Sequence, residues 1–73
     1  MPKLPRVSGV EAQRAFERLG FHKVRQSGSH VIMKRESKGC VLPMHSELKT
    51  GTLAGVLRQA EVSAEEFILA LRG

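Results

Sequence analysis

The stretch Arg25-Gln26-Ser27-Gly28-Ser29-His30 predicts the fold of this 73-residue chain. It is short and polar, and it joins two segments, 21–26 and 29–35, in which charged and apolar residues are interleaved. We expect Ser27-Gly28 to be the two-residue turn of a β-hairpin, because glycine adopts a positive φ without steric cost. His30 then lies where the second strand begins, on a regular element that fixes its position.

The residues after this turn predict the rest of a small sheet. Alternation along the second strand separates the side chains of its two faces: His30, Ile32 and Lys34 on one, and Val31, Met33 and Arg35 on the other. A second turn is expected at 36–39 and a short third strand at 40–42. Pro43 ends that strand, because proline has no N–H to continue the ladder. The expected sheet is a three-stranded antiparallel meander.

A helix is expected before the sheet. Ser8 and Glu11 have the spacing of a capping box, in which each side chain accepts from the other residue's backbone N–H. Apolar residues then recur at helical spacing as far as Gly20, where a left-handed cap would end the helix. These are Ala12, Ala15, Phe16 and Leu19. Residues 1–7 are expected to be an extended lead-in, because proline disfavours helical geometry in the residue before it.

Two more helices are expected after the sheet. Residues 44–49 are interpreted as a polar loop, and the helix that follows is capped by either Thr50 or Thr52. Ser63 begins a second capping box, and the last helix, at about 64–71, buries its apolar side chains. These are Phe67, Ile68 and Leu71.

The order of elements is therefore α-β-β-β-α-α, in a single α+β domain that covers residues 1–73. A sheet with helices packed on one face leaves its other face open to water or to a ligand.

The charge of the chain suggests a polyanionic partner. There are 12 Lys and Arg against 7 acidic residues, all of them Glu. Cations gather in 23–38, whereas 61–66 contains Glu but neither Lys nor Arg. A basic face attracts nucleic acid by charge and counterion release. A surface that merely keeps the protein in solution explains the same charges, and composition does not separate these interpretations.

Composition also bears on where the protein works. No segment approaches the roughly 20 apolar residues that a membrane-spanning helix needs, so no membrane partner is expected. The charged N-terminus has no apolar run behind it and is not interpreted as a signal peptide. Cys40 is the only cysteine, which excludes an internal disulfide and is typical of a protein in the reducing cytoplasm.

Neither a metal site nor a reactive nucleophile is expected. The histidines at 22, 30 and 45 and the single cysteine do not have the spacing of zinc ligands. The chain has no Asp, so a carboxylate site for two metal ions is hard to build. Cys40 is interpreted as a small core residue. No cofactor is therefore predicted.

His30 is the strongest candidate for a chemical role. RNA carries its own nucleophile, the 2′-hydroxyl, and its cleavage needs a base, an acid and positive charge near the reacting phosphate. Histidine is suited to proton transfer near neutral pH, and Arg25 and Lys34 in the same hairpin could supply the charge. Spacing alone favours the simpler interpretation, in which His30 packs or hydrogen-bonds at a turn.

His45 is a second candidate with two interpretations. It precedes a helix N-terminus, where backbone N–H groups favour anions, and could bind phosphate or transfer a proton. An exposed loop histidine without such a role fits equally well. Base stacking of the kind used by RNA-recognition sheets is not expected, since the chain has neither Trp nor Tyr.

Short motifs in a fixed order make the chain resemble the HicA family, the mRNA interferase toxins of HicA–HicB toxin–antitoxin pairs. They are Leu4-Pro5, Ser8-Gly9-x-Glu11, Leu19-Gly20-Phe21, Arg25-Gln26-x-Gly28-Ser29-His30, Pro43-x-His45, Gly51-Thr52-Leu53 and Ser63-x-Glu65-Glu66-Phe67. The resemblance implies a fold like that of a double-stranded-RNA-binding domain. It also implies an endoribonuclease whose essential residue is the histidine of Gly-Ser-His, here His30, and a HicB antitoxin that covers the active face.

We expect the residues around His30 to bind the RNA. These are Arg25, Gln26, Gly28, Ser29, Lys34 and His45. Double-stranded-RNA-binding domains carry a lysine cluster at the start of their final helix, and Gly51-Thr52-Leu53 has none. Single-stranded or mRNA segments are therefore the expected substrate.

Two other hypotheses fit the residues without catalysis. The basic face could belong to a non-catalytic RNA- or DNA-binding module, which would bind in a salt-dependent way without turnover. It could also serve a domain that binds an acidic protein partner and has no affinity for nucleic acid.

Overall fold

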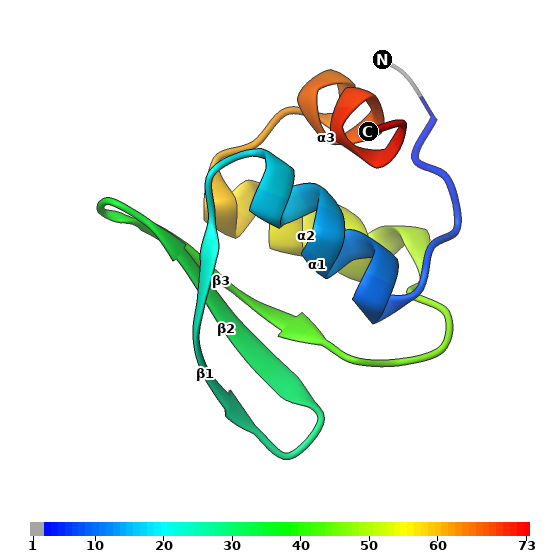
Figure 1. The fold of residues 1–73 in the computed structure, drawn as a ribbon. Helices are drawn as coiled ribbons and strands as arrows, with labels where there is room; N and C mark the ends of the chain where they lie inside the picture. The colour runs from blue at the N-terminus through cyan, green and yellow to red at the C-terminus, as the bar shows by residue number, and fades with distance from the viewer. Residues whose placement is uncertain (1–2) are drawn as a thin grey trace.

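Three helices lie over one side of a three-stranded antiparallel sheet (Figure 1). The computed structural model describes residues 3–73. In chain order the elements are α1 (Gly9–Arg18), β1 (His22–Ser27), β2 (His30–Arg35), β3 (Lys38–Pro43), α2 (Thr50–Ala60) and α3 (Ala64–Leu71). The predicted α+β order is confirmed. The part of the predicted lead-in at residues 1 and 2 lies outside the described residues.

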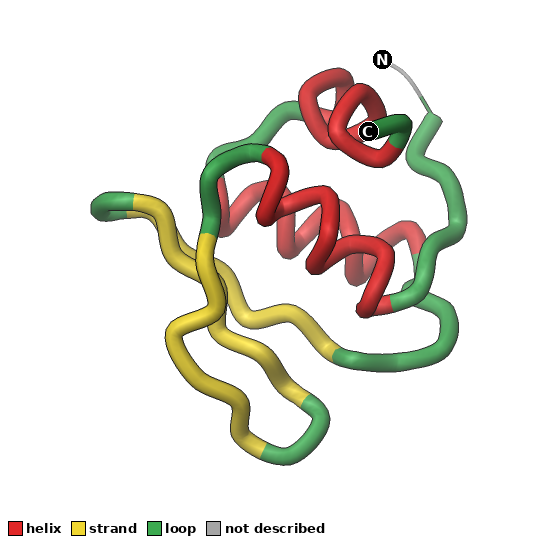
Figure 2. The backbone as a smooth tube through the Cα atoms, viewed as in Figure 1, coloured by secondary structure: helices red, strands yellow, loops and turns green. Residues whose placement is uncertain are grey.

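The sheet has the order β1-β2-β3, with β2 in the centre. Helices α1 and α2 cover the face that β2 and β3 turn toward the core, and α3 packs on α1 on the side away from the sheet. Figure 2 shows the end of the β1–β2 hairpin extending beyond the helical layer. Every residue of β1 is exposed, so both faces of that strand are open to solvent.

The hairpin turn lies one residue later than predicted. Ser27 pairs with His30, so the turn residues are Gly28 and Ser29, and the expected Ser27-Gly28 turn is wrong. Gly28 has φ +58°, which places the positive angle at the first turn position, where hairpins favour glycine. The Gln26 side chain donates from Nε2 to the Gly28 carbonyl at 3.1 Å and braces the turn.

A bulge interrupts the simple alternation of β1. Lys23 pairs with Met33 and Arg25 with Ile32, so Val24 is the extra residue between them. A bulge shifts the side chains beyond it to the other face relative to a regular strand. Arg25 consequently shares a face with Ile32, and that face is the one opposite the helices.

The third strand is longer than predicted. It begins at Lys38, which pairs with Arg35, and the turn is therefore Glu36-Ser37 rather than 36–39. Glu36 takes φ +55°, an angle that non-glycine residues seldom adopt. The prediction that Pro43 ends the strand is confirmed, because it is the last residue of β3.

Both serine capping boxes form as predicted, whereas the threonine cap does not. Ser8 and Ser63 each accept from the backbone N–H of the glutamate three residues later, at 3.0 and 3.1 Å. The N-cap of α2 is Lys49, with no side-chain hydrogen bond, so neither Thr50 nor Thr52 caps this helix.

Gly20 follows α1 and its C-cap residue Leu19, and it supplies the left-handed cap that was expected there. Gly20 has φ +95°, and the Phe21 N–H donates back to the Phe16 carbonyl at 3.0 Å, as in a Schellman motif. Arg35 of β2 adds a tertiary cap, because its Nη1 donates to the Leu19 carbonyl at 2.6 Å. Its guanidinium also lies 4.7 Å from the centre of the Phe21 ring.

One hydrophobic core joins the helices to the inner face of the sheet. Its largest fully buried side chains are Phe16, Phe67, Met33, Leu42, Leu48, Leu53 and Val31. Leu48 was not expected there, because 44–49 was interpreted as a polar loop; it is 1% exposed, and its N–H donates to the Val7 carbonyl at 2.7 Å.

The last helix buries a slightly different set of residues from the predicted one. Phe67 is buried as expected, but the second buried residue is Ala70. Ile68 and Leu71 are only partly buried, because α3 contacts the core with a narrow side. Among residues 3–73, no helix has the length and apolar character to cross a membrane.

Candidate functional site

The backbone of His30 is fixed by strand pairing on both sides, and its side chain is exposed to solvent. It is the first residue of the central strand and pairs with Ser27 of β1 on one side and Pro43 of β3 on the other. The residue is exposed, and it belongs to the face of the sheet opposite the buried Val31 and Met33. Such an arrangement presents an imidazole to a ligand from a rigid support.

A groove between β3 and α2 opens beside His30. It has a volume of about 670 Å³. From the sheet it is lined by His30, Val41 and Pro43, and from α2 by Thr52, Gly55, Val56, Arg58 and Gln59. We call it the β3–α2 groove. Its position is fixed by a direct link between the walls, since the Val41 N–H donates to Gln59 Oε1 at 3.3 Å.

A smaller depression continues the groove along β3. It has a volume of about 420 Å³ and shares Val41 and Gln59 with the groove. Its other lining residues are Ile32, Lys34, Gly39 and Cys40. Lys34 therefore stands at the opposite end of the strip from His30. The floor between them is apolar and open, as the 42% exposure of Val41 shows.

The structure places the predicted site residues of the β1–β2 hairpin in three different settings. Arg25 and Lys34 share the face of His30, through the pairing of Arg25 with Ile32 and the alternation along β2. Gln26 pairs with Val31, which puts its side chain on the other face of the sheet, and Gly28 and Ser29 form the exposed turn. These last three residues shape the hairpin and do not line the groove.

His45 lies on the loop after β3 and is exposed, but it is not among the residues that line the β3–α2 groove. Its backbone is well fixed. The Gly9 N–H donates to the His45 carbonyl at 2.8 Å, and the neighbouring Met44 N–H donates to the Ser29 carbonyl at 2.6 Å. The loop is thus tied to both the start of α1 and the hairpin turn.

Of the sequence motifs, only Gly51-Thr52-Leu53 contributes to the α2 side of the groove, through Thr52. A further signal for this side exists. The apolar stripe of α2 consists of Leu53, Val56, Leu57 and Ala60. The opposite side carries polar residues and a glycine in the middle of the helix, which is unusual because glycine weakens helices. Only the tertiary packing brings this side of α2 to the same groove as His30.

Neither a reactive thiol nor a cluster of metal ligands accompanies His30 among the described residues. Burial raises the pKa of the Cys40 thiol from 9.0 to about 11, so this residue stays protonated at neutral pH. Within residues 3–73, no group of three or more His, Cys, Asp or Glu side chains is arranged to hold a metal ion.

The order of elements and the helices on one face of an antiparallel sheet define an α+β domain like a double-stranded-RNA-binding domain, with a histidine exposed beside a groove. Residues 9–62 match the family described as HicA toxin of bacterial toxin–antitoxin. The chain belongs to this family, which makes it the toxin of a toxin–antitoxin system and implies an antitoxin partner. Comparison with curated proteins and with solved structures gives no significant match.

Proposed function

We propose that this toxin is a metal-independent endoribonuclease that cleaves single-stranded segments of mRNA with His30 as general base or acid. The observation that carries the proposal is the position of His30 in a member of the HicA family. The side chain stands exposed at the start of the central strand and lines the β3–α2 groove. HicA toxins are mRNA interferases, and the histidine of Gly-Ser-His is their essential residue.

The proposed reaction is an internal transfer at the phosphate. The 2′-hydroxyl loses its proton to a base and its oxygen bonds to phosphorus. The bond from phosphorus to the 5′-oxygen breaks, and that oxygen receives a proton from an acid. The products are a 2′,3′-cyclic phosphate and a 5′-hydroxyl. His30 performs one of the two proton transfers, and the nucleophile comes from the RNA itself.

Cations on the same face support the binding of RNA. Arg25 and Lys34 flank the strip that leads away from His30. Positive groups fixed near a phosphate attract the strand and stabilise the extra negative charge of the transition state. The apolar floor at Ile32 and Val41 favours a single strand, whose bases can turn away from their neighbours and lie against apolar side chains.

The HicB-type antitoxin is proposed to neutralise the toxin by covering this face. The open side of the sheet is basic and has no helix over it, so a partner bound there would block access to His30. The expected result is that the purified antitoxin inhibits RNA cleavage in proportion to the complex formed.

The decisive test is cleavage of a single-stranded RNA in the presence of EDTA by the wild type and by His30→Ala. The wild type is expected to cut and to leave 2′,3′-cyclic phosphate ends. His30→Ala is expected to lose activity by about 10²–10⁴-fold while its thermal unfolding stays unchanged, because the side chain is exposed. Equal activity of the two proteins, loss of wild-type activity in EDTA, or 3′-hydroxyl products would contradict the proposal.

A further inference from the structure

We infer that α2 supplies the second half of the active site: Arg58 binds the phosphate that is cleaved, and Gly55 keeps the space that this phosphate occupies. The role of Arg58, which depends on the proposed function of His30, would be catalytic, since its guanidinium would touch the reacting group. The resulting substrate path is the β3–α2 groove itself, between the sheet and the helix.

Arg58 is placed and charged for this role. It is exposed and lines the same groove as His30, from the other wall. The ion pairs within residues 3–73 are Arg6 with Glu47 and Lys38 with Glu61, so no carboxylate neutralises the Arg58 guanidinium. A free cation opposite a histidine is what a phosphate in the groove requires.

The type of residue matters as well as its charge. A guanidinium presents its N–H donors in a planar fork that binds two phosphate oxygens at once, whereas the ammonium of lysine acts as a point charge. Negative charge grows on these oxygens as the 2′-oxygen attacks. A fork that is already in place therefore stabilises the transition state more than the bound substrate.

The position of Arg58 also suits a structural role, because it lies in the last turn of α2, where a cation interacts favourably with the helix dipole. Arg58→Lys separates the two roles. It keeps the positive charge at the helix end and removes the fork.

Gly55 gives an independent indication of a ligand. It lies in the middle of α2, where glycine is less favourable than alanine for helix stability. Nothing in the fold requires it, since an added Cβ would meet only Arg58 Nη2, at 4.0 Å. We therefore attribute this glycine to the groove, where the absence of a side chain leaves space for a ligand. A methyl group at this position would enter the space beside the guanidinium.

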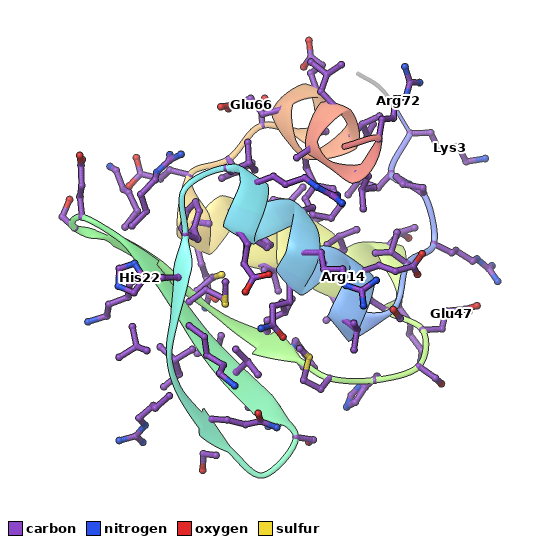
Figure 3. The ribbon with its side chains drawn as sticks, in the orientation of Figure 1. Lys3, Arg14, His22, Glu47, Glu66 and Arg72 are labelled. Atoms are coloured by element: carbon purple, nitrogen blue, oxygen red, sulfur yellow. The ribbon has the colours of Figure 1, made fainter. Side chains whose placement is uncertain are left out.

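The first experiment measures steady-state cleavage of a single-stranded RNA by Arg58→Gln, Arg58→Lys and the control Arg14→Gln. Arg14 is an exposed arginine on α1 that does not line the groove (Figure 3). We expect kcat to fall about 10²-fold in Arg58→Gln and about tenfold in Arg58→Lys. Arg14→Gln is expected to stay within about twofold of the wild type. All three variants should keep the wild-type circular dichroism spectrum.

The second experiment compares Gly55→Ala with Gly51→Ala. Gly51 is in the same helix, has no atom within 4 Å of an added Cβ, and does not line the groove. Both changes are expected to raise Tm by several degrees, about 4 °C, through helix propensity. Only Gly55→Ala is expected to lower kcat/KM, by about tenfold or more, because its methyl group displaces the phosphate. A loss of activity in a more stable protein excludes misfolding as the cause.

The outcomes separate this inference from the proposed function. If His30→Ala cleaves as well as the wild type, the proposed function itself is wrong. If His30→Ala is inactive while Arg58→Gln and Gly55→Ala match their controls, the histidine acts without α2 and the inference is overturned. If Arg58→Lys retains full activity, the arginine serves the helix end, and its assignment to the phosphate is overturned.

Discussion

Cys40 shows at the scale of one residue how burial changes chemistry. It follows Gly39 on β3, faces the core and is 5% exposed. Burial disfavours the thiolate and raises the pKa to about 11. Cys40 is therefore a packing residue, although it also lines the smaller depression along β3. The interpretation of this cysteine as a small hydrophobic residue agrees with its burial.

The raised pKa predicts how stability depends on pH. Between pH 9 and pH 11 the unfolded chain releases the thiol proton while the folded protein still holds it. The free energy of unfolding should therefore fall as pH rises through this interval, and the contribution of Cys40 is fully present below pH 9. Urea unfolding at pH 8 and pH 10.5 measures the fall. Cys40→Ala should show a smaller difference between the two pH values, and an equal difference would contradict the prediction.

At the scale of elements, the N-terminal caps differ between the helices. Local side-chain hydrogen bonds cap α1 and α3, whereas α2 has no such cap. Ser8 starts α1 with a hydrogen bond that the sequence predicts, whereas α2 starts at Thr50 without any side-chain cap. The start of α2 is fixed instead by Leu48 just before it, which is buried in the core and bonded to the Val7 carbonyl.

Replacing the capping residues tests this difference. Ser8→Ala removes the acceptor for the Glu11 N–H and should lower the free energy of unfolding by about 1 kcal/mol. Thr50→Ala removes no such bond and should change it by less than about 0.5 kcal/mol. Denaturant unfolding of both variants measures the contrast. A loss of about 1 kcal/mol in Thr50→Ala would show that its hydroxyl caps the helix in solution.

Gly9 joins two elements that are distant in the sequence. The start of α1 lies so close to the end of β3 that a Cβ on Gly9 would overlap the Pro43 carbonyl oxygen and come within 2.6 Å of Met44 Cα. The same residue donates its N–H to the His45 carbonyl. Gly9 of the Ser8-Gly9 motif is therefore in direct contact with the Pro43-x-His45 motif.

We predict that Gly9→Ala is strongly destabilising although alanine favours helices. The methyl group must push the loop after β3 away, at a cost of about 2–3 kcal/mol, and this exceeds the gain in helix propensity of about 1 kcal/mol. Val10→Ala, at the exposed neighbouring position, is the control and should change stability little. Equilibrium unfolding in urea compares the two. Stability equal to that of the wild type in Gly9→Ala would show that the contact gives way at little cost.

At the scale of the molecule, charge is distributed unevenly around the fold. Arg25 and Lys34 lie on the open face of the sheet, and Arg58 lies across the groove from it. Basic and acidic regions are only partly separated, because Lys38 near the second turn pairs with Glu61 after α2 at 2.7 Å. Cations also lie far from the sheet, among them Arg72 beside α3 (Figure 3).

This distribution predicts the salt dependence of RNA binding by the inactive variant His30→Ala. If Arg25, Lys34 and Arg58 each contact a phosphate, log K for a single strand should fall with log salt with a slope of about −2. Lys34→Gln should reduce the slope by about 0.7, and Arg72→Gln should leave it unchanged. Fluorescence anisotropy of a labelled RNA gives K at salt concentrations from about 50 to about 300 mM, and the slope is taken from these values. Equal slopes for Lys34→Gln and Arg72→Gln would place the RNA elsewhere.

The short-range signals of the sequence determined most of the fold. The capping boxes at Ser8 and Ser63, the glycine that ends α1 and the alternation along β2 each involve residues within a few positions of one another. Interactions of this range form in the same way wherever the segment lies, so they can be derived from the chain alone. The predicted position of His30 at the start of a strand depended on such signals.

The tertiary structure alone decided the register of the hairpin, the bulge at Val24 and the burial of Leu48. It also decided that Arg58 and Gly55 line the groove beside His30. These features depend on contacts between segments far apart in the chain, where the energy of packing a whole face outweighs the preference of any single residue. The sequence by itself determined the elements and the family motifs that contain His30. The arrangement of the sheet and α2 as the two walls of an open groove was decided only by packing them on a common core.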